Sequence, residues 1–320
     1  MRILGTGSAL PALTVSNDAL AKFLDTSDEW IKTRTGIESR HILTDETLAD
    51  MAILAAQRAL NSAHVAGSEI DLIIGTTTRG ELIAPAMACL VQKAVGASCP
   101  CMDLNAACTG FLYGLDTALA YIQSGKAKKI LIVSAEGMSR LCDWSDRSTC
   151  VLFGDGAGAV VLDGGEGLLS IRLGVSEDRD TLFIQPAPNN NPFAAPSKVI
   201  PGVHMAGQEV FKFAVSHATE DISKVLSDAG IAQEDVQWFL LHQANRRILE
   251  SVRQRLNAPE DKFPSNIYHV GNTSSASIPI LLDELNQQGR LKHGDLIVMS
   301  AFGAGLSTGA CLLRWQCSPR

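Results

Sequence analysis

The sequence predicts an α/β fold made of two similar halves, and three observations support this expectation. Apolar segments of strand length alternate along the chain with segments whose apolar residues recur at helical spacing. Part of the first half recurs in the second half at a constant offset of 166 residues, as between Leu60 and Leu226. The 320 residues, of which 46% are hydrophobic and 19% charged, are enough to bury a large core.

The elements of the first half follow one another in a regular order. Ser27 stands before Asp28 and Trp30 as the N-cap of a short helix. Further helices are predicted over 49–60, 85–95 and 108–124, and strands over 71–76, 101–104, 130–134 and 157–162. Several of these strands are apolar along their whole length, which predicts a sheet covered by helices on both faces.

The second half repeats this order. Residues 60–74 line up with 226–240 at the offset of 166, and residues 125–134 resemble 289–300 at an offset of 164 to 166. We infer an internal duplication, with halves 1–165 and 166–320 packed around a pseudo-twofold axis that brings equivalent strand ends together. Residues 166–206 break the alternation with Asn189–Asn191 and five prolines, and are predicted to form a loop-rich cover across the join.

Cys108 lies where a short apolar strand gives way to a helix. Unpaired N–H groups and the positive end of the helix dipole favour a thiolate at such a position, so we expect a pKa below the usual value of about 8.5 and a nucleophilic cysteine. A small, inert cysteine at a close contact between strand and helix is an equally valid interpretation of these residues alone.

The repeat relates Cys108 to two further polar residues. Adding the offset to Thr76 gives His242, and a similar offset relates Cys108 to Asn272, each at the end of a predicted strand. One converged site containing Cys108, His242 and Asn272 is the resulting hypothesis. The remaining histidines, at 41, 64, 204, 217, 269 and 293, are interpreted as surface or satisfied polar groups.

Trp30 and Arg34 are spaced to share one side of a helix. This pair fits either a nucleotide contact or a half-buried tryptophan packed under an arginine.

Composition excludes several classes of protein. A net charge of −7 argues against a general nucleic-acid binder, and no apolar run approaches the length of a membrane span. Gly5, Gly7 and Pro11 interrupt the N-terminal segment, so no signal-peptide core is expected and the predicted location is cytoplasmic. The eight cysteines are then reduced thiols. Cys99 and Cys101 are too close for usual zinc spacing, and neither a metal nor another cofactor is assigned.

Six motifs that span nearly the whole chain carry a resemblance to a known family. They are Ser27–Ile31, Thr33–Ile37, Asn105–Phe111, Phe153–Ala159, His242–Asn245 and Gly271–Pro279. In content and order they resemble the motif set of 3-oxoacyl-[acyl-carrier-protein] synthase III (beta-ketoacyl-ACP synthase III, FabH), in the thiolase superfamily. The resemblance implies a thiolase-like fold whose two duplicated βαβ halves pack as a layered α/β/α/β/α core, and a homodimer.

The resemblance also implies an activity and roles for residues. The reaction is the initiating condensation of type II fatty acid synthesis, in which an acyl-CoA primer, acetyl-CoA by default, reacts with malonyl-ACP through an acyl-Cys108 intermediate. Four sets of residues support it: His242 and Asn272 as the decarboxylation pair; the backbone N–H groups of Cys108 and Ala304 as the oxyanion hole; Trp30, Arg34 and Arg147 at the coenzyme A entrance; and Lys212, Arg247 and Arg253 as contacts for the acyl carrier protein. Ala84 and Phe302 are assigned to the primer pocket.

The chain departs from the family pattern at three positions. Ala304 replaces a glycine of the usual Phe-Gly-Gly-Gly motif, which is tolerable if its backbone dihedrals suit a non-glycine residue. Thr308 stands where tryptophan is frequent, and Ala84 where phenylalanine is frequent. These two changes bear on the shape of the primer pocket.

Other functions share parts of this pattern. Papain-like cysteine hydrolases use Cys, His and Asn in the same chain order, but their local cysteine signature is missing here. A non-catalytic protein that binds acyl carrier protein would not need an intact Cys108. A synthase that primes a polyketide or another secondary pathway would share the same three residues.

Overall fold

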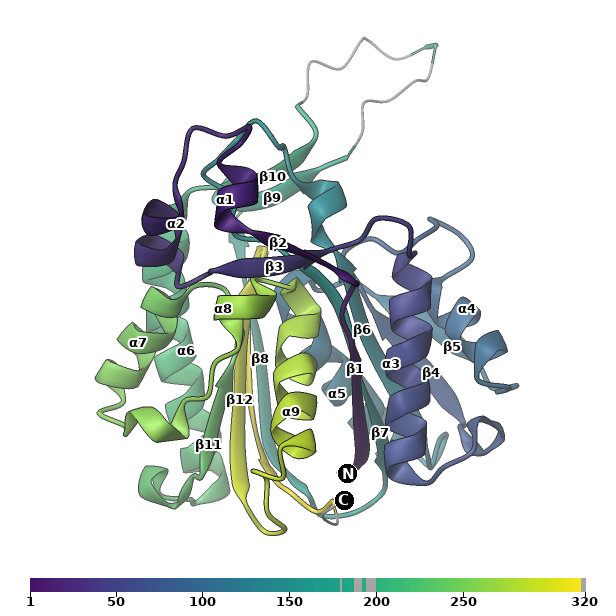
Figure 1. Ribbon diagram of the computed structural model, residues 1–320. Coiled ribbons are helices and arrows are strands. Elements are labelled where there is room, and N and C mark those ends of the chain that lie inside the picture. Colours follow the sequence, from purple (N-terminus) through teal and green to yellow (C-terminus); the bar gives the residue numbers. More distant parts are fainter. Residues whose placement is uncertain (179, 187–191, 194–199, 318–320) are drawn as a thin grey trace.

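Two β-sheets form the frame of the protein, which Figure 1 shows as a computed structural model. The structure describes residues 1–178, 180–186, 192–193 and 200–317. Strands of the first sheet lie in the order β1-β7-β6-β4-β5, and those of the second in the order β11-β12-β13-β8. Their bounds are β1 (Arg2–Ala9), β4 (Leu72–Thr76), β5 (Cys101–Leu104), β6 (Ile130–Gly137), β7 (Asp155–Asp163), β8 (Leu168–Asp178), β11 (Trp238–Leu241), β12 (Leu296–Gly303) and β13 (Gly305–Arg314).

Helices fill the space between the sheets and cover their outer faces. Two of them, α5 (Gly110–Gln123) and α9 (Ser277–Gln287), contribute to an apolar core that also contains residues of both sheets. The first sheet is covered by α3 (Leu48–Ala63) and α4 (Met87–Ala94), and the second by α6 (Gly207–Ala229) and α7 (Arg246–Arg255). The predicted α/β/α/β/α layering is therefore confirmed.

The first strand, β1, is missing from the sequence-based prediction because Gly5 and Gly7 were interpreted as interruptions. In the structure these glycines let α3 lie directly against the strand. A Cβ atom at Gly5 would be 2.4 Å from the backbone nitrogen of Ala63, and one at Gly7 would be 2.4 Å from the carbonyl oxygen of Ala55. Glycine thus marks a close helix contact here and does not end the strand.

The prediction of a loop-rich cover over residues 166–206 is wrong in part. This stretch contains β8, which pairs with β13 and so belongs to the second sheet, and a hairpin of β9 (Leu182–Gln185) and β10 (Gly202–Met205). Asn189–Asn191 lie outside the described residues. The rest of the upper region consists of β2 (Leu13–Ser16), β3 (Ser39–Ile42), α1 (Asn17–Leu20), α2 (Asp28–Thr35) and α8 (Ile267–Val270).

Parallel strand pairs bring chemically important residues to one end of the molecule. In the first sheet β4 pairs in parallel with β5 and β6, and in the second β11 pairs in parallel with β12. Residues at the carboxyl ends of parallel strands meet at the same sheet edge, which is where ligands bind in many α/β proteins. Two short turns, η2 (Ala107–Thr109) and η6 (Ser274–Ala276), lead from these edges into α5 and α9. Within the described chain, no helix is both long and apolar enough to span a lipid bilayer.

Candidate active site

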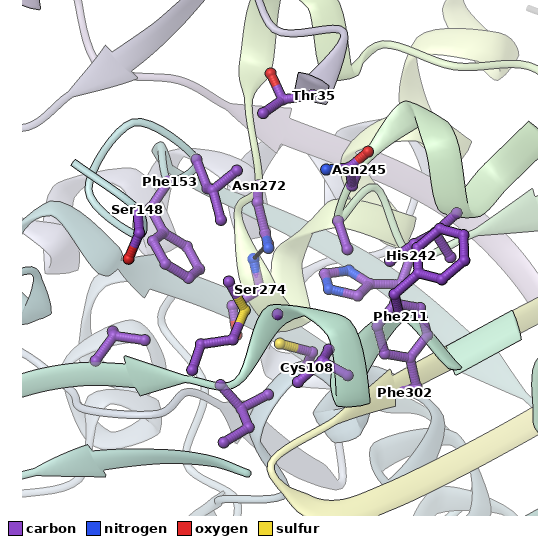
Figure 2. Close-up of a pocket in the computed structure, with 18 of the residues that line it drawn as sticks. Thr35, Cys108, Ser148, Phe153, Phe211, His242, Asn245, Asn272, Ser274 and Phe302 are labelled. Carbon is purple, nitrogen blue, oxygen red and sulfur yellow. Dashed lines mark hydrogen bonds between the residues drawn. The ribbon is translucent and has the colours of Figure 1, made fainter. Parts of the chain in front are cut away.

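A cavity of about 690 Å³ opens where the two halves meet. Cys108, His242 and Asn272 all line it, and Figure 2 shows their side chains gathered around one space. Its other walls are mainly apolar, with Met138, Val151, Leu152, Phe153, Leu182, Ile184, Val203, Met205, Phe211 and Phe302 among them. The sequence hypothesis of one site built by these three residues therefore agrees with the geometry.

Cys108 lies in the middle of η2, two residues before α5 begins at Gly110. The preceding residue, Ala107, has a φ of 46°, so the chain turns sharply and carries the thiol to the floor of the cavity. Burial, assisted by the nearby Glu136 carboxylate, raises the pKa of the Cys108 thiol to about 12. The expectation of a lowered pKa is wrong, because desolvation of the thiolate outweighs the favourable helix end.

The backbone around Cys108 is packed closely against β12. A Cβ atom at Gly303 would lie 2.8 Å from the Cys108 backbone nitrogen, so only glycine allows this approach. Ala304, the next residue, lines the cavity and is not among the described non-glycine residues with positive φ. The methyl group of Ala304 therefore causes no backbone strain at this departure from the family motif.

His242 follows β11 and is 1% exposed. Its Nδ1 lies 2.7 Å from the Ser277 hydroxyl, which also accepts a hydrogen bond from the backbone N–H of Gln243. The hydroxyl of Ser277 keeps its own proton to donate to Nδ1, and with that donation the imidazole proton lies on Nε2. Burial lowers the pKa of His242 to about 3, so the ring is neutral near pH 7 and acts as a hydrogen-bond donor.

Asn272 is held by both halves of the chain. Its backbone N–H donates to the carbonyl of Leu152 at 2.9 Å, and its own carbonyl accepts from the N–H of Gly154 at 3.0 Å. The side-chain Oδ1 accepts from the backbone N–H of Ser274 at 2.9 Å. Because Oδ1 is occupied, the Nδ2 group is the part of the amide that remains to donate within the cavity.

Trp30 and Arg34 stand at the mouth of this cavity, on α2. The guanidinium carbon of Arg34 lies 4.6 Å from the centroid of the Trp30 ring, and that of Arg147 lies 5.3 Å from it. Arg147 also bonds Asp25 and does not itself line the cavity. The Trp30 ring therefore has two guanidinium groups within the range of a cation–π interaction.

Of the basic residues assigned to carrier-protein docking, Lys212 and Arg247 line the cavity mouth. Lys212 pairs with Glu209 at 2.9 Å, and Arg247 lies over the ring of Phe211. Arg253 is farther along α7 and is held by Glu250, so part of its charge is already compensated.

The two residues assigned to the primer pocket are placed differently. Phe302 lines the cavity, and its ring centroid lies 5.3 Å from that of His242. Ala84 is exposed in the loop before α4 and does not line this chain's own cavity. Thr308 is buried beside Asp221 in a separate hollow, so its difference from the family pattern does not alter the shape of the cavity.

Three polar residues that support the site had no role in the sequence prediction. Ser274 and Ser277 belong to a motif whose other members were singled out, and their hydroxyls support Glu136 and His242. Glu136 is fully buried near the end of β6. Nothing in the sequence around it indicated that this glutamate would face the site. Among the residues that the structure describes, no cluster of His, Cys, Asp and Glu is arranged to hold a metal ion.

The chain is similar to a known family of enzymes over nearly its whole length. The family model described as 3-oxoacyl-[acyl-carrier-protein (ACP)] synthase III matches residues 102–176. The model for the C-terminal part of the same family matches residues 226–315. A beta-ketoacyl-[acyl-carrier-protein] synthase III of Clostridium acetobutylicum is 44% identical over 98% of both chains.

Two solved structures extend this similarity. The 3-oxoacyl-[acyl-carrier-protein] synthase III of Aquifex aeolicus is 44% identical with a TM-score of 0.91, covering 98% of this chain and 99% of that one. The priming beta-ketosynthase of the R1128 polyketide pathway is 35% identical with a TM-score of 0.93, covering 100% of this chain and 97% of that one.

Proposed function

The chain belongs to the 3-oxoacyl-[acyl-carrier-protein] synthase III family, and we propose that Cys108, His242 and Asn272 perform the chemistry of that family in it. It is an acyltransferase of the initiating condensation in fatty acid synthesis. Acyl-CoA and malonyl-ACP are its substrates, and we propose acetyl-CoA as the default primer. The observation that carries the assignment of residues is their convergence on a single cavity.

In the first step Cys108 accepts the acyl group. Its sulfur attacks the thioester carbon, the carbonyl oxygen becomes negatively charged, and coenzyme A leaves as the thiol. Backbone N–H groups of Cys108 and Ala304 are proposed to stabilise that oxygen, since Gly303 brings the two backbones together. Exchange of one thioester for another is nearly neutral in energy, so a cysteine suits the task.

In the second step malonyl-ACP loses CO₂, and the resulting enolate attacks the acyl group on Cys108. Negative charge then develops on the malonyl thioester oxygen. We assign its stabilisation to Nε2–H of His242 and Nδ2–H of Asn272, because the other polar atom of each side chain is already occupied. A donor of this kind is typically worth about 3 kcal/mol in the transition state.

We propose that positively charged side chains at the cavity mouth recognise both substrates. Trp30, Arg34 and Arg147 form a group suited to the adenine and phosphates of coenzyme A. Lys212, Arg247 and Arg253 are the proposed contacts for an acidic acyl carrier protein.

We also propose a homodimer in a reducing compartment, the cytoplasm. Strand β5 ends the first sheet, and its outer edge is available for pairing. In the loop before α4, Leu82 and Ile83 are 48% and 96% exposed, as expected of residues that a partner covers. No disulfide joins the cysteines of the described chain, which fits a reducing environment.

Mass spectrometry of the intact protein and its peptides tests this proposal. After incubation with a panel of acyl-CoAs, we expect one acyl group on the peptide that contains Cys108, with acetyl transferred readily. Acyl groups found on another peptide would contradict the role of Cys108. A strong preference for longer or branched primers would instead contradict acetyl-CoA as the default primer.

A further inference from the structure

Glu136 is a buried carboxylate without a basic partner. It is 0% exposed, and none of the ion pairs among the described residues includes it. Oε2 accepts a hydrogen bond from the backbone N–H of Thr78 at 2.9 Å. Oε1 accepts from the hydroxyls of Thr78, Ser274 and Ser275 at 3.2, 3.0 and 2.6 Å, and from the Ser275 N–H at 3.3 Å. A buried charge of this kind is costly to maintain, so its retention calls for an explanation.

Ser274 links this carboxylate to the reacting sulfur. Its hydroxyl donates to Glu136 at 3.0 Å, and its oxygen also interacts with the Cys108 side chain, so it is free to accept the thiol proton. The three side chains come from β6, η6 and η2, so the link crosses from one half of the protein to the other. Figure 2 shows Ser274 beside Cys108 on the floor of the cavity.

The Cys108 thiol must lose its proton during acyl transfer, and His242 is poorly suited to accept it. The resting thiol is protonated, because its pKa is raised to about 12. His242 has its pKa lowered to about 3 by burial, and its Nδ1 is occupied by Ser277. Burial raises the pKa of Glu136 above the usual value for glutamic acid, which makes its carboxylate a stronger base than one in water.

We propose that Ser274 and Glu136 relay the thiol proton of Cys108 during acyl transfer. As the sulfur attacks the acyl-CoA carbonyl, the thiol proton passes to the Ser274 oxygen and the Ser274 proton passes to Glu136. Glu136 is then a neutral acid, and Cys108 carries the acyl group. The proton returns by the reverse path to the departing coenzyme A sulfur, so Glu136 regains its charge and no external acid or base is consumed.

The relay is favourable because it conserves charge inside a dry site. Carboxylate plus thiol and carboxylic acid plus thiolate both hold one negative charge. Ionising the thiol while Glu136 stays charged would place two negative charges in the same low-dielectric region. Cys108 and His242 are the titratable side chains that face the Ser274 network from η2 and from the end of β11. The relay rests on the proposed role of Cys108 as the nucleophile.

Single-turnover acylation by acetyl-CoA, followed by rapid quenching and mass spectrometry across a pH series, tests the relay. The Glu136→Gln variant keeps the size of the side chain and loses the base, so its acylation rate should fall by about 10²-fold or more. The parent rate should decline as the pH drops through the pKa of Glu136, and the variant should lack that decline. Acylation of Glu136→Gln at or above the parent rate would overturn the relay, since it would mean that the carboxylate only hinders ionisation of the thiol.

Two neighbouring serines provide a matched comparison that does not depend on replacing the buried acid. Both hydroxyls bond Glu136, but the hydroxyl of Ser274 also contacts Cys108. We expect Ser274→Ala to slow acylation nearly as much as Glu136→Gln, and Ser275→Ala to slow it far less. Equal losses would overturn the relay and indicate only structural support of the carboxylate. Glu136→Asp retains a base and should retain the acid limb of the pH profile.

Peptide mapping of the acylated parent separates this test from that of the proposed function. An acyl group on Cys108 of the parent with unchanged rates in the variants would disprove the relay alone. A parent that is never acylated at Cys108 would disprove the proposed function.

Discussion

The same turn is built once in each half of the protein, with different chemical results. In the first half the Asn105 side-chain oxygen accepts from the N–H of Ala107 at 3.1 Å, and in the second the Asn272 oxygen accepts from the N–H of Ser274 at 2.9 Å. Ala107 and Ser274 have nearly equal positive φ values of 46° and 49°. Each turn leads into a central helix, α5 or α9. The structural counterpart of Asn272 is thus Asn105, and that of Cys108 is Ser275.

The two turns differ in which residue faces the cavity. In the first turn Cys108 faces it, whereas Asn105 is exposed and its Nδ2 donates to the carbonyl of Thr78 at 3.2 Å. In the second turn Asn272 faces the cavity and Ser275 is buried against Glu136. The comparison teaches that one backbone motif presents a thiol to the cavity from one half and a side-chain amide from the other. Covalent acyl transfer and enolate stabilisation are thereby assigned to different halves.

Replacing the nucleophile of the first half has the largest expected effect. Cys108→Ser should abolish acylation by acetyl-CoA without unfolding the protein, because one sulfur is exchanged for an oxygen. Cys89→Ser, a half-exposed cysteine on α4 outside the cavity, serves as the control. Intact-mass measurement after incubation with acetyl-CoA reports the result. An added acetyl group on Cys108→Ser would show that another residue is the nucleophile.

The buried, neutral His242 of the second half should make the free energy of unfolding depend on pH. The pKa of His242 is about 3 in the folded protein and about 6.5 when unfolded, so only the unfolded chain gains a proton as the pH falls below 6.5. His242 therefore lowers the free energy of unfolding by on the order of 2 kcal/mol between pH 6.5 and 5. His242→Gln should lose less stability over this interval in urea titrations. Parallel pH curves for parent and variant would mean that the ring is not buried in its neutral form.

The surface of the second half is tested by reversing one charge. Arg247→Glu should raise the apparent KM for malonyl-ACP by about tenfold and make it depend less on salt, since an attractive contact becomes repulsive. Acylation by acetyl-CoA, which belongs to the first half, should change little. Lys224→Glu, on α6 and outside this cavity, is the matched control. If acylation and KM changed together in Arg247→Glu, the basic surface would not be a separate docking site.

The smallest effect is expected at Ala84 in the first half. This residue is exposed and lies outside its own cavity, so it would reach a primer only in the partner chain of the proposed homodimer. Ala84→Phe should reduce acylation by longer primers relative to acetyl-CoA by a few-fold, as expected for added bulk in an apolar pocket. An unchanged ratio of the two rates would remove Ala84 from primer selection.

Sequence reasoning predicted the layers, and it placed Cys108, His242 and Asn272 in one cavity, because strand periodicity and the family motifs reflect local spacing. The offset that related Cys108 to Asn272 is wrong, because the matching turns pair Cys108 with Ser275 and Asn105 with Asn272. It missed β1, whose glycines look like breaks until α3 is seen lying against them. It assigned Cys108 a lowered pKa because the helix end is visible in sequence, whereas desolvation and the charge of Glu136 depend on folding. The contacts of Ser274 and Ser277 likewise arise only when distant segments pack together.

The division of labour between the halves is tested most directly by Asn272→Ala, with acylation and CO₂ release measured on the same preparation. Acyl-Cys108 should form at a near-normal rate, because Asn272 contributes nothing to that step. Release of CO₂ from malonyl-ACP should fall by roughly 10²-fold or more, the usual effect of losing one oxyanion donor. Asn272→Asp should not restore it, since a carboxylate repels the developing enolate. Loss of both activities together, or of neither, would contradict the account.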